Sequence, residues 1–227
     1  MPLLTVGHRG LMGVEPENTL RSFRRAERAG VDAVELDLRL SKDGELVVIH
    51  DAEVERTTDG SGRVADLTLA ELRGLDAGRG ERVPLFTEVV AAVAAPLQAE
   101  IKDPAAARSL ALAVGHGRLH GRVRAISFHE EALREIRERL PGLPVALVTG
   151  RSTATAPERA AALGADMVSC ELAHLDPDVV GRCRAAGVRV IAWTVNDAAE
   201  LARARALGLD GVVTDVPRIV RAVRTAA

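Results

Sequence analysis

The sequence predicts an α/β fold, a TIM-type (β/α)8 barrel with a small insertion after the second strand. Its length of 227 residues suits a barrel of this kind. Short β-rich runs alternate with amphipathic helical runs eight times, which is the pattern of a parallel barrel. The last six predicted strands begin 21 to 26 residues apart, a spacing that fits one strand, one helix and two short loops.

The elements follow one another in a regular order. The predicted strands cover residues 3–7, 33–38, 97–101, 123–127, 144–148, 166–170, 188–192 and 210–214. The predicted helices cover residues 17–29, 86–94, 104–114, 129–139, 156–163, 177–186, 197–207 and 217–226. The first helix has an apolar and a polar face, marked by Leu20, Phe23, Arg24 and Glu27. Glycines that favour helix C-termini follow four helical runs, at Gly30, Gly164, Gly187 and Gly208. Asp176-Pro177 and Asn196-Asp197 indicate helix starts.

Residues 39–85 interrupt this alternation of strands and helices. They contain a ninth strand candidate, LVVI at 46–49, followed by a polar stretch rich in Gly, Asp and Arg. Insertions of this kind carry function when they follow the C-terminal end of a barrel strand. We therefore expect one domain over residues 1–227, with residues 52–84 forming an insertion on the barrel mouth.

The composition limits the classes of function. Hydrophobic residues make up 47% of the chain and aromatic residues only 2%, so Ala, Val and Leu must fill the core. A net charge of −2 offers no basic surplus for nucleic acid. Two cysteines, Cys170 and Cys183, cannot form a disulfide framework, which favours a reducing, cytoplasmic location. No segment approaches the roughly 18 apolar residues of a membrane helix, so stable membrane insertion is not expected.

Two carboxylates in VELDLRL are the first candidates for chemistry. Glu35 and Asp37 are two residues apart on a predicted strand, so both side chains point to one face. The layer of helices outside a barrel is a costly place for charge, whereas at the C-terminal mouth the pair could bind a hard cation. The alternative is an ion pair with a Lys or Arg of the barrel.

A predicted hairpin brings His50 toward these carboxylates. Asp43-Gly44 is a strong two-residue turn signal. With these two residues as the turn, residue 42 pairs with residue 45, and Asp37 falls opposite His50. Opposed residues of an antiparallel pair share a face. The convergence favours a functional histidine over a structural one.

Two further strand ends carry charged side chains. His8 and Arg9 follow the first strand, where a histidine can transfer protons and an arginine can grip a phosphate. Glu100 and Lys102 share a face on a later strand and could add a third metal ligand and a cation for substrate charge. A solvated strand-end cap and a simple Glu–Lys pair are the alternatives. The single Trp193 falls at another strand end, where it either fills the core or forms a substrate wall.

Taken in order, these motifs resemble the glycerophosphodiester phosphodiesterase family. The matching segments are His8-Arg9-Gly10, Pro16-Glu17-Asn18-Thr19, Glu35-x-Asp37, Asp43-Gly44, His50-Asp51, Arg56-Thr57-Thr58 with Gly60, Glu100-Ile101-Lys102, Ser127-Phe128, Trp193-Thr194-Val195-Asn196 and Thr214-Asp215 with Pro217. They extend from residue 7 to residue 217. Each segment is weak evidence alone, but the ordered set is highly specific.

The resemblance implies a barrel enzyme that hydrolyses a small-molecule glycerophosphodiester to glycerol 3-phosphate and an alcohol. It implies one divalent cation, Ca²⁺ or Mg²⁺, held by Glu35, Asp37 and Glu100. By the same matching, His8 and His50 are the acid/base pair. The implied substrate-binding residues are Arg9, Lys102 and Trp193.

Other interpretations remain at this point. A lysophospholipase D-type enzyme is one, because the loop at residues 11–15 is more apolar than a polar headgroup needs. A non-catalytic phosphate-ligand-binding barrel is another, and fold alone would also allow an isomerase or aldolase. The sequence leaves open the alcohol group, the metal, the oligomeric state and which histidine is the base. The nucleophile is either water or the neighbouring glycerol hydroxyl.

Overall fold

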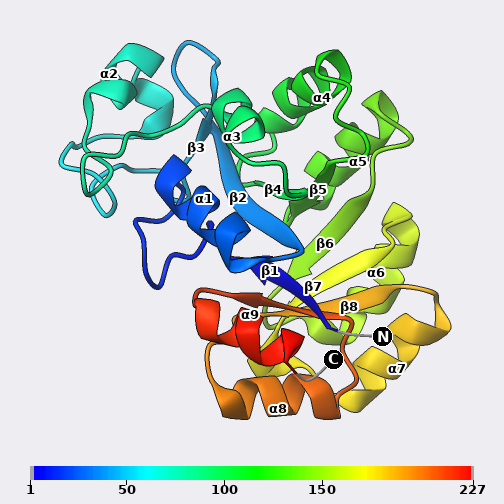
Figure 1. Ribbon diagram of the computed structural model, residues 1–227. Coiled ribbons are helices and arrows are strands. Elements are labelled where there is room, and N and C mark those ends of the chain that lie inside the picture. Colours follow the sequence, from blue (N-terminus) through cyan, green and yellow to red (C-terminus); the bar gives the residue numbers. More distant parts are fainter. Residues whose placement is uncertain (1–2, 226–227) are drawn as a thin grey trace.

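The computed structural model describes residues 3–225, which form a closed parallel β-barrel surrounded by helices (Figure 1). The barrel strands are β1 (Leu4–Gly7), β2 (Ala33–Leu40), β4 (Leu97–Ile101), β5 (Val123–Ser127), β6 (Val145–Thr149), β7 (Met167–Glu171), β8 (Arg189–Trp193) and β9 (Gly211–Thr214). Strand β1 pairs in parallel with both β9 and β2, and these pairings close the barrel. The predicted fold class is confirmed, and each predicted barrel strand overlaps an observed one.

The helices also follow the predicted order. They are α1 (Leu20–Ala29), α3 (Phe86–Ala92), α4 (Ala106–His116), α5 (Glu130–Arg139), α6 (Ala156–Leu163), α7 (Pro177–Ala185), α8 (Ala198–Ala206) and α9 (Pro217–Arg224). The first helix begins three residues later than expected, because the Thr19 hydroxyl caps it by accepting the Ser22 N–H. The predicted end of the last helix, residue 226, lies outside the described residues. None of the helices described within residues 3–225 combines the length and apolar character needed to cross a membrane.

Alternating side chains divide the core into two layers. Val6, Ile126, Val148, Met167 and Ile191 belong to a cluster inside the barrel. The alternate positions of the strands pack against the helices in a larger cluster that is rich in Ala, Val and Leu. Because each fully buried aliphatic side chain contributes about 1.5–3 kcal/mol, this composition supports the barrel with few aromatic residues.

The hairpin formed by β2 and β3 (Leu46–Val48) has a register different from the predicted one. Leu38 opposes Val48, so Asp37 falls opposite Ile49 and not His50. The Ile49 N–H accordingly donates to the Asp37 carbonyl, with N and O 3.0 Å apart. The predicted pairing of Asp37 with His50 is therefore wrong by one residue.

The cause is the length of the loop. The hairpin loop has three residues, Lys42 to Gly44, and the Ser41 N–H donates to the Glu45 carbonyl across it. Gly44 adopts a φ of 81°, which suits the left-handed third position of such a loop. The loop therefore has three residues where a two-residue turn was predicted. A shift of the register by one residue moves each side chain to the other face of the strand.

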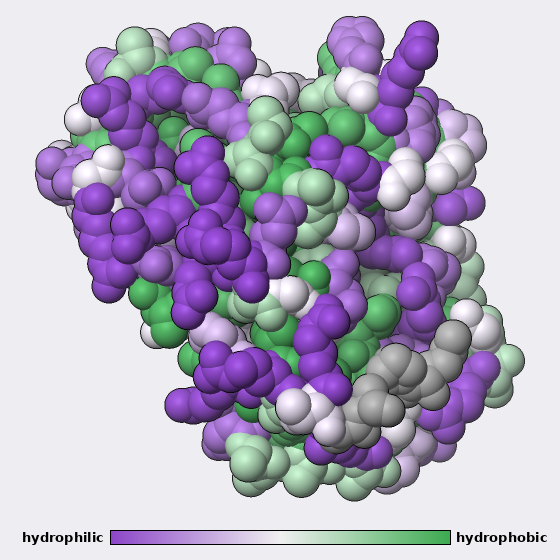
Figure 2. Space-filling model, viewed as in Figure 1, coloured by the Kyte–Doolittle hydropathy of each residue, from purple (hydrophilic) through white to green (hydrophobic). Residues whose placement is uncertain are grey.

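The segment after β3 forms an insertion with a small core of its own. It contains the 3-10 turn Val64–Asp66 and helix α2 (Leu69–Gly74). Its buried cluster includes Val47, Ile49, Val54, Val64, Leu72, Ala77 and Val83. Figure 1 shows this region, in cyan, set to one side of the barrel, and Figure 2 shows mainly hydrophilic side chains over it. Helix α2 was not predicted from the sequence.

Candidate active site

The candidate site lies at the C-terminal ends of the barrel strands, around a cavity of about 180 Å³. Of the eight site residues that the sequence predicted, seven line this cavity: His8, Arg9, Glu35, His50, Glu100, Lys102 and Trp193. Asp37, the eighth, is 1% exposed and belongs to the same carboxylate cluster as Glu35 and Glu100. The structure therefore brings together side chains from strand ends that are far apart in the chain.

Three carboxylates form the centre of the site. Glu35, Asp37 and Glu100 each offer an oxygen, and these oxygens lie within 4.8 Å of one another. The backbone N–H of Arg9 donates to one Glu35 oxygen at 2.8 Å, whereas the other oxygen is buried without a hydrogen-bond partner among the described residues. The Asn18 amide donates to Asp37 at 2.8 Å. A buried, unpaired carboxylate oxygen facing two further carboxylates suits a hard cation with oxygen ligands.

The electrostatics of the cluster support the same conclusion. Burial raises the pKa of Glu35 well above its ordinary value, and repulsion from Asp37 and Glu100 adds to that rise. Burial and Asp37 also raise the pKa of Glu100, against the lowering effect of Lys102. Each charged form is thus disfavoured in the protein alone, and a bound cation would stabilise both.

His50 reaches the cavity through a bend of the chain beyond the end of β3. Its carbonyl accepts a hydrogen bond from Nε of Arg39 at 2.8 Å, which fixes this bend. Its Nδ1 lies 2.5 Å from the Asp51 carboxylate, and its Nε2 lies 3.1 Å from Nζ of Lys102. Since a carboxylate and an ammonium flank the ring, Nδ1 carries the proton and Nε2 accepts. Burial is the largest cause that lowers the pKa of His50.

His8 also lines the cavity and has a matching arrangement. It follows β1, and its Nδ1 lies 2.7 Å from the carboxylate of Asp215, which follows β9. Asn196 fixes Asp215 in turn, because its amide donates to Oδ2 at 2.5 Å and its carbonyl oxygen accepts the Asp215 N–H at 2.8 Å. Burial is the largest single cause and raises the pKa of Asp215, but the hydrogen bonds from His8 and Asn196, together with the charges of His8 and Arg9, lower the pKa overall. Both histidines therefore have a carboxylate that sets the tautomer.

Arg9 lines the cavity and belongs to a network of charged side chains. Its guanidinium donates to Glu17 at 2.8 Å, and its Nε lies 3.2 Å from Asp37. Arg56 of the insertion donates to the same Glu17 and also to Asp51, with its Nε 2.5 Å from the Asp51 carboxylate. The insertion is thus connected to the carboxylate that holds His50.

Lys102 and two aromatic rings complete the cavity. Nζ of Lys102 lies 2.7 Å from Glu100, 3.8 Å from Asp37 and 5.6 Å from the centre of the Phe128 ring. Phe128 packs edge-to-face on Trp193, with ring centroids 6.0 Å apart. Trp193 therefore lines the cavity and also packs against the cluster inside the barrel, and its contact with substrate stays a prediction.

Asp51 and Asp215 hold the two histidines but were not predicted as site residues. A signal for both was available: Asp51 adjoins His50 in sequence, and closure of a barrel places the last strand beside the first. The remaining histidines lie elsewhere. His129 and His174 face Glu131 and Glu171 at 3.7 and 3.5 Å and do not line the cavity.

Known proteins are similar to this chain over nearly its whole length. Residues 8–219 match the Glycerophosphoryl diester phosphodiesterase family. A glycerophosphodiester phosphodiesterase of Caldanaerobacter subterraneus is 34% identical over 232 residues, which cover 96% of each chain. Another from Bacillus subtilis is 32% identical over 98% of this chain and 86% of its own.

Solved structures share the fold as well. A phosphodiesterase of Oleispira antarctica, in complex with the product sn-glycerol-3-phosphate, is 28% identical with a TM-score of 0.90. The match covers 99% of this chain and 97% of the Oleispira antarctica chain. A glycerophosphodiester phosphodiesterase of Thermotoga maritima has a TM-score of 0.85 and 27% identity over 99% of each chain. On this evidence, the chain belongs to the glycerophosphoryl diester phosphodiesterase family.

Proposed function

We propose that this chain hydrolyses glycerophosphodiesters to glycerol 3-phosphate and an alcohol, in a reaction that depends on a divalent cation. The observation that carries the proposal is the buried cluster of three carboxylates, set between two histidines that each hold a carboxylate through Nδ1. Relatives named glycerophosphodiester phosphodiesterase and a structural neighbour that holds sn-glycerol-3-phosphate support it.

We assign Glu35, Asp37 and Glu100 as the residues that hold one Ca²⁺ or Mg²⁺. The unpaired oxygen of Glu35 and the mutual repulsion of the cluster fit a hard cation. When bound, such a cation acts as a Lewis acid toward the phosphoryl oxygens. Lys102 adds a fixed positive charge beside it, and Arg9 keeps Asp37 and Glu17 in place.

His8 and His50 carry the two proton transfers. One takes the proton of the nucleophile, which is water or the neighbouring glycerol hydroxyl, and the other protonates the departing alkoxide. The hydroxyl route first forms a cyclic phosphate, which water then opens to glycerol 3-phosphate. Because Asp215 and Asp51 hold the two Nδ1 atoms, Nε2 is the nitrogen that would exchange a proton with the substrate on each ring. On His50 this nitrogen lies 3.1 Å from Nζ of Lys102, which the substrate would have to displace. A proton transfer of this kind typically contributes about 10²–10⁴-fold in rate.

The direct test combines chelation with histidine variants. After treatment with EDTA, release of glycerol 3-phosphate from glycerophosphocholine is expected to stop and to return with Ca²⁺ or Mg²⁺. His8→Ala and His50→Ala are each expected to lose at least about 10²-fold in kcat with an unchanged thermal unfolding curve. His116→Ala, at the exposed end of α4, is the matched control. Activity near the wild-type level in either site variant would overturn the assignment.

A lysophospholipid substrate finds less support. Leu11, the first residue of the apolar loop at 11–15, is 0% exposed and packs into the core. The loop therefore offers Val14 as its exposed large apolar side chain rather than a continuous apolar rim. We expect lysophosphatidylcholine to react more slowly than glycerophosphocholine.

We also propose that residues 1–227 form one domain and that the protein is cytoplasmic. The second proposal rests on Cys170 and Cys183, which are free thiols.

A further inference from the structure

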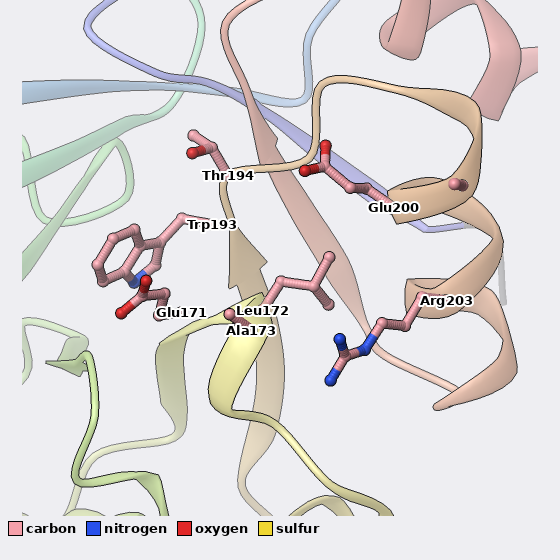
Figure 3. A pocket seen from close by; sticks show the side chains of 8 residues that line it. Glu171, Leu172, Ala173, Trp193, Thr194, Glu200 and Arg203 are labelled. Carbon is pink, nitrogen blue, oxygen red and sulfur yellow. The ribbon is translucent and has the colours of Figure 1, made fainter.

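A second cavity opens beside the candidate active site. It has a volume of about 460 Å³ and lies between the ends of β7 and β8 and the first turns of α8 (Figure 3). Trp193 and Thr194 line both cavities. The two cavities are therefore adjacent across Trp193, and we call the second one the side cavity.

Glu171 is the carboxylate of the side cavity that is available to a ligand. It ends β7 and is the direct neighbour of Trp193 in the parallel pairing with β8. Its nearest charged partner among the described residues is His174, at 3.5 Å, which is too long for a strong hydrogen bond. By contrast, the other carboxylate, Glu200, already accepts the N–H groups of Asn196 and Asp197 at the start of α8.

Trp193 supplies an aromatic surface next to this carboxylate. Its indole N–H donates to the Ser169 carbonyl at 3.2 Å, and its ring meets Phe128 edge-to-face at 80°, so two contacts fix the plane of the ring. Figure 3 shows the Glu171 carboxylate beside the indole. Lys102 already lies over the Phe128 ring, whereas the Trp193 ring borders the side cavity. A carboxylate beside an indole is the combination that binds an ammonium group.

The charges of the lining residues favour the same ligand. Two carboxylates, Glu171 and Glu200, face one guanidinium, Arg203, which gives the lining a net charge of −1. The Arg203 guanidinium is held by the Leu175 carbonyl at 3.1 Å. The phosphate half of the substrate would meet Lys102, and the opposite half would meet Glu171.

We propose that the side cavity is the subsite for the alcohol group of the substrate and that it selects a positively charged amino alcohol, such as choline or ethanolamine. Glu171 pairs with the ammonium, and Trp193 contacts its methyl or methylene groups. A neutral polyol loses the ion pair, and an alcohol that carries a carboxylate is repelled by Glu171. This inference rests on the proposed hydrolysis of glycerophosphodiesters.

Glu171→Gln tests the proposal with two substrates that differ in the charge of the alcohol. For glycerophosphocholine we expect KM to rise about tenfold with little change in kcat, which corresponds to about 1.4 kcal/mol. For glycerophosphoglycerol, whose alcohol is neutral, we expect both constants to stay within about twofold. Glu171→Asp keeps the charge and should retain most of the preference. Added salt should reduce the wild-type preference, because the carboxylate is partly exposed.

The outcomes separate the two levels of the proposal. Glu138→Gln, an exposed acid on α5, is the control and should change neither substrate. An equal loss with both substrates would show that Glu171 serves the shared glycerol phosphate or the fold, and no loss would show that it contacts neither; both results overturn the subsite. If the wild type hydrolyses neither substrate with any cation, the proposed function itself fails.

Discussion

Without a divalent cation, the Glu35→Gln variant is expected to be more stable than the wild type. The oxygens of Glu35, Asp37 and Glu100 lie within 4.8 Å, and at that separation two unit charges repel by about 3.5 kcal/mol with an effective dielectric constant of about 20. Lys102 and Arg9 offset part of this repulsion at Glu100 and Asp37 through direct ion pairs, whereas Glu35 has the backbone N–H of Arg9 and a smaller attraction to the Arg9 charge. The free energy of unfolding of Glu35→Gln should therefore exceed that of the wild type by about 1–3 kcal/mol. Each kcal/mol raises Tm by about 2–4 °C.

Thermal unfolding in EDTA and in excess Ca²⁺ or Mg²⁺ measures this effect. A cation present at a thousand times its Kd should stabilise the wild type by about 4.1 kcal/mol, and the variant by much less. The order of stability of the two proteins should therefore reverse when the cation is added. Lower stability of Glu35→Gln in EDTA, together with full stabilisation by the cation, would refute the assignment of this cluster. Glu138→Gln, an exposed carboxylate change, should leave both curves unchanged.

The pH dependence of the stability difference between the two proteins tests the same prediction independently. The pKa of Glu35 in the folded protein lies well above its ordinary value of 4.5, first through burial and then through Asp37 and Glu100. The folded state therefore holds this proton more tightly than the unfolded state. Below pH 4.5 the group is protonated in both states, and the advantage of the variant in EDTA should vanish. As the pH rises through the folded pKa, the wild type loses stability and the advantage should appear.

Three further outcomes follow from contacts around the site. Asp51→Asn and Asp215→Asn should each lower kcat by at least about 10²-fold with little change in KM, because the amide can reverse the tautomer of its histidine; steady-state kinetics would contradict this if kcat stayed unchanged. Arg56→Gln should lower the free energy of unfolding in urea by about 1 kcal/mol or less. It should lower kcat about tenfold, because Arg56 orients Asp51. An effect on stability alone would limit Arg56 to a structural role. Burial raises the pKa of the Cys170 thiol to about 12 and that of Cys183 to about 11, so both should resist a thiol reagent at pH 8 until the protein unfolds; rapid labelling of the native protein would disprove this.

The barrel was predictable because its signals are local. Helix α6 has the bounds predicted from the sequence, with Gly164 in a left-handed conformation directly after it. Asp197 caps α8 together with Glu200, as a capping box does. Helix α2 was missed, although Thr68 and Glu71 form the same motif, because six residues between polar loops carry too little periodicity.

The site was only partly predictable, and one residue that lines the cavity was placed there by incorrect geometry. His50 was expected beside Asp37 through the hairpin register, but Gly44 extends the loop and shifts that register. His50 reaches the cavity because the chain bends after β3 and Arg39 holds its carbonyl. Contacts such as Glu17 with Arg56 join segments 39 residues apart, and no local pattern encodes them.

The most direct test follows the phosphorus signal of a glycerophosphodiester by ³¹P nuclear magnetic resonance with the purified protein. In Ca²⁺ or Mg²⁺, the diester signal of glycerophosphocholine should convert to that of glycerol 3-phosphate. Conversion should stop in EDTA and in the Glu35→Gln variant, which lacks one of the three clustered carboxylates. A diester signal that stays unchanged with either cation, or that converts equally well in EDTA, would contradict a cation-dependent phosphodiesterase.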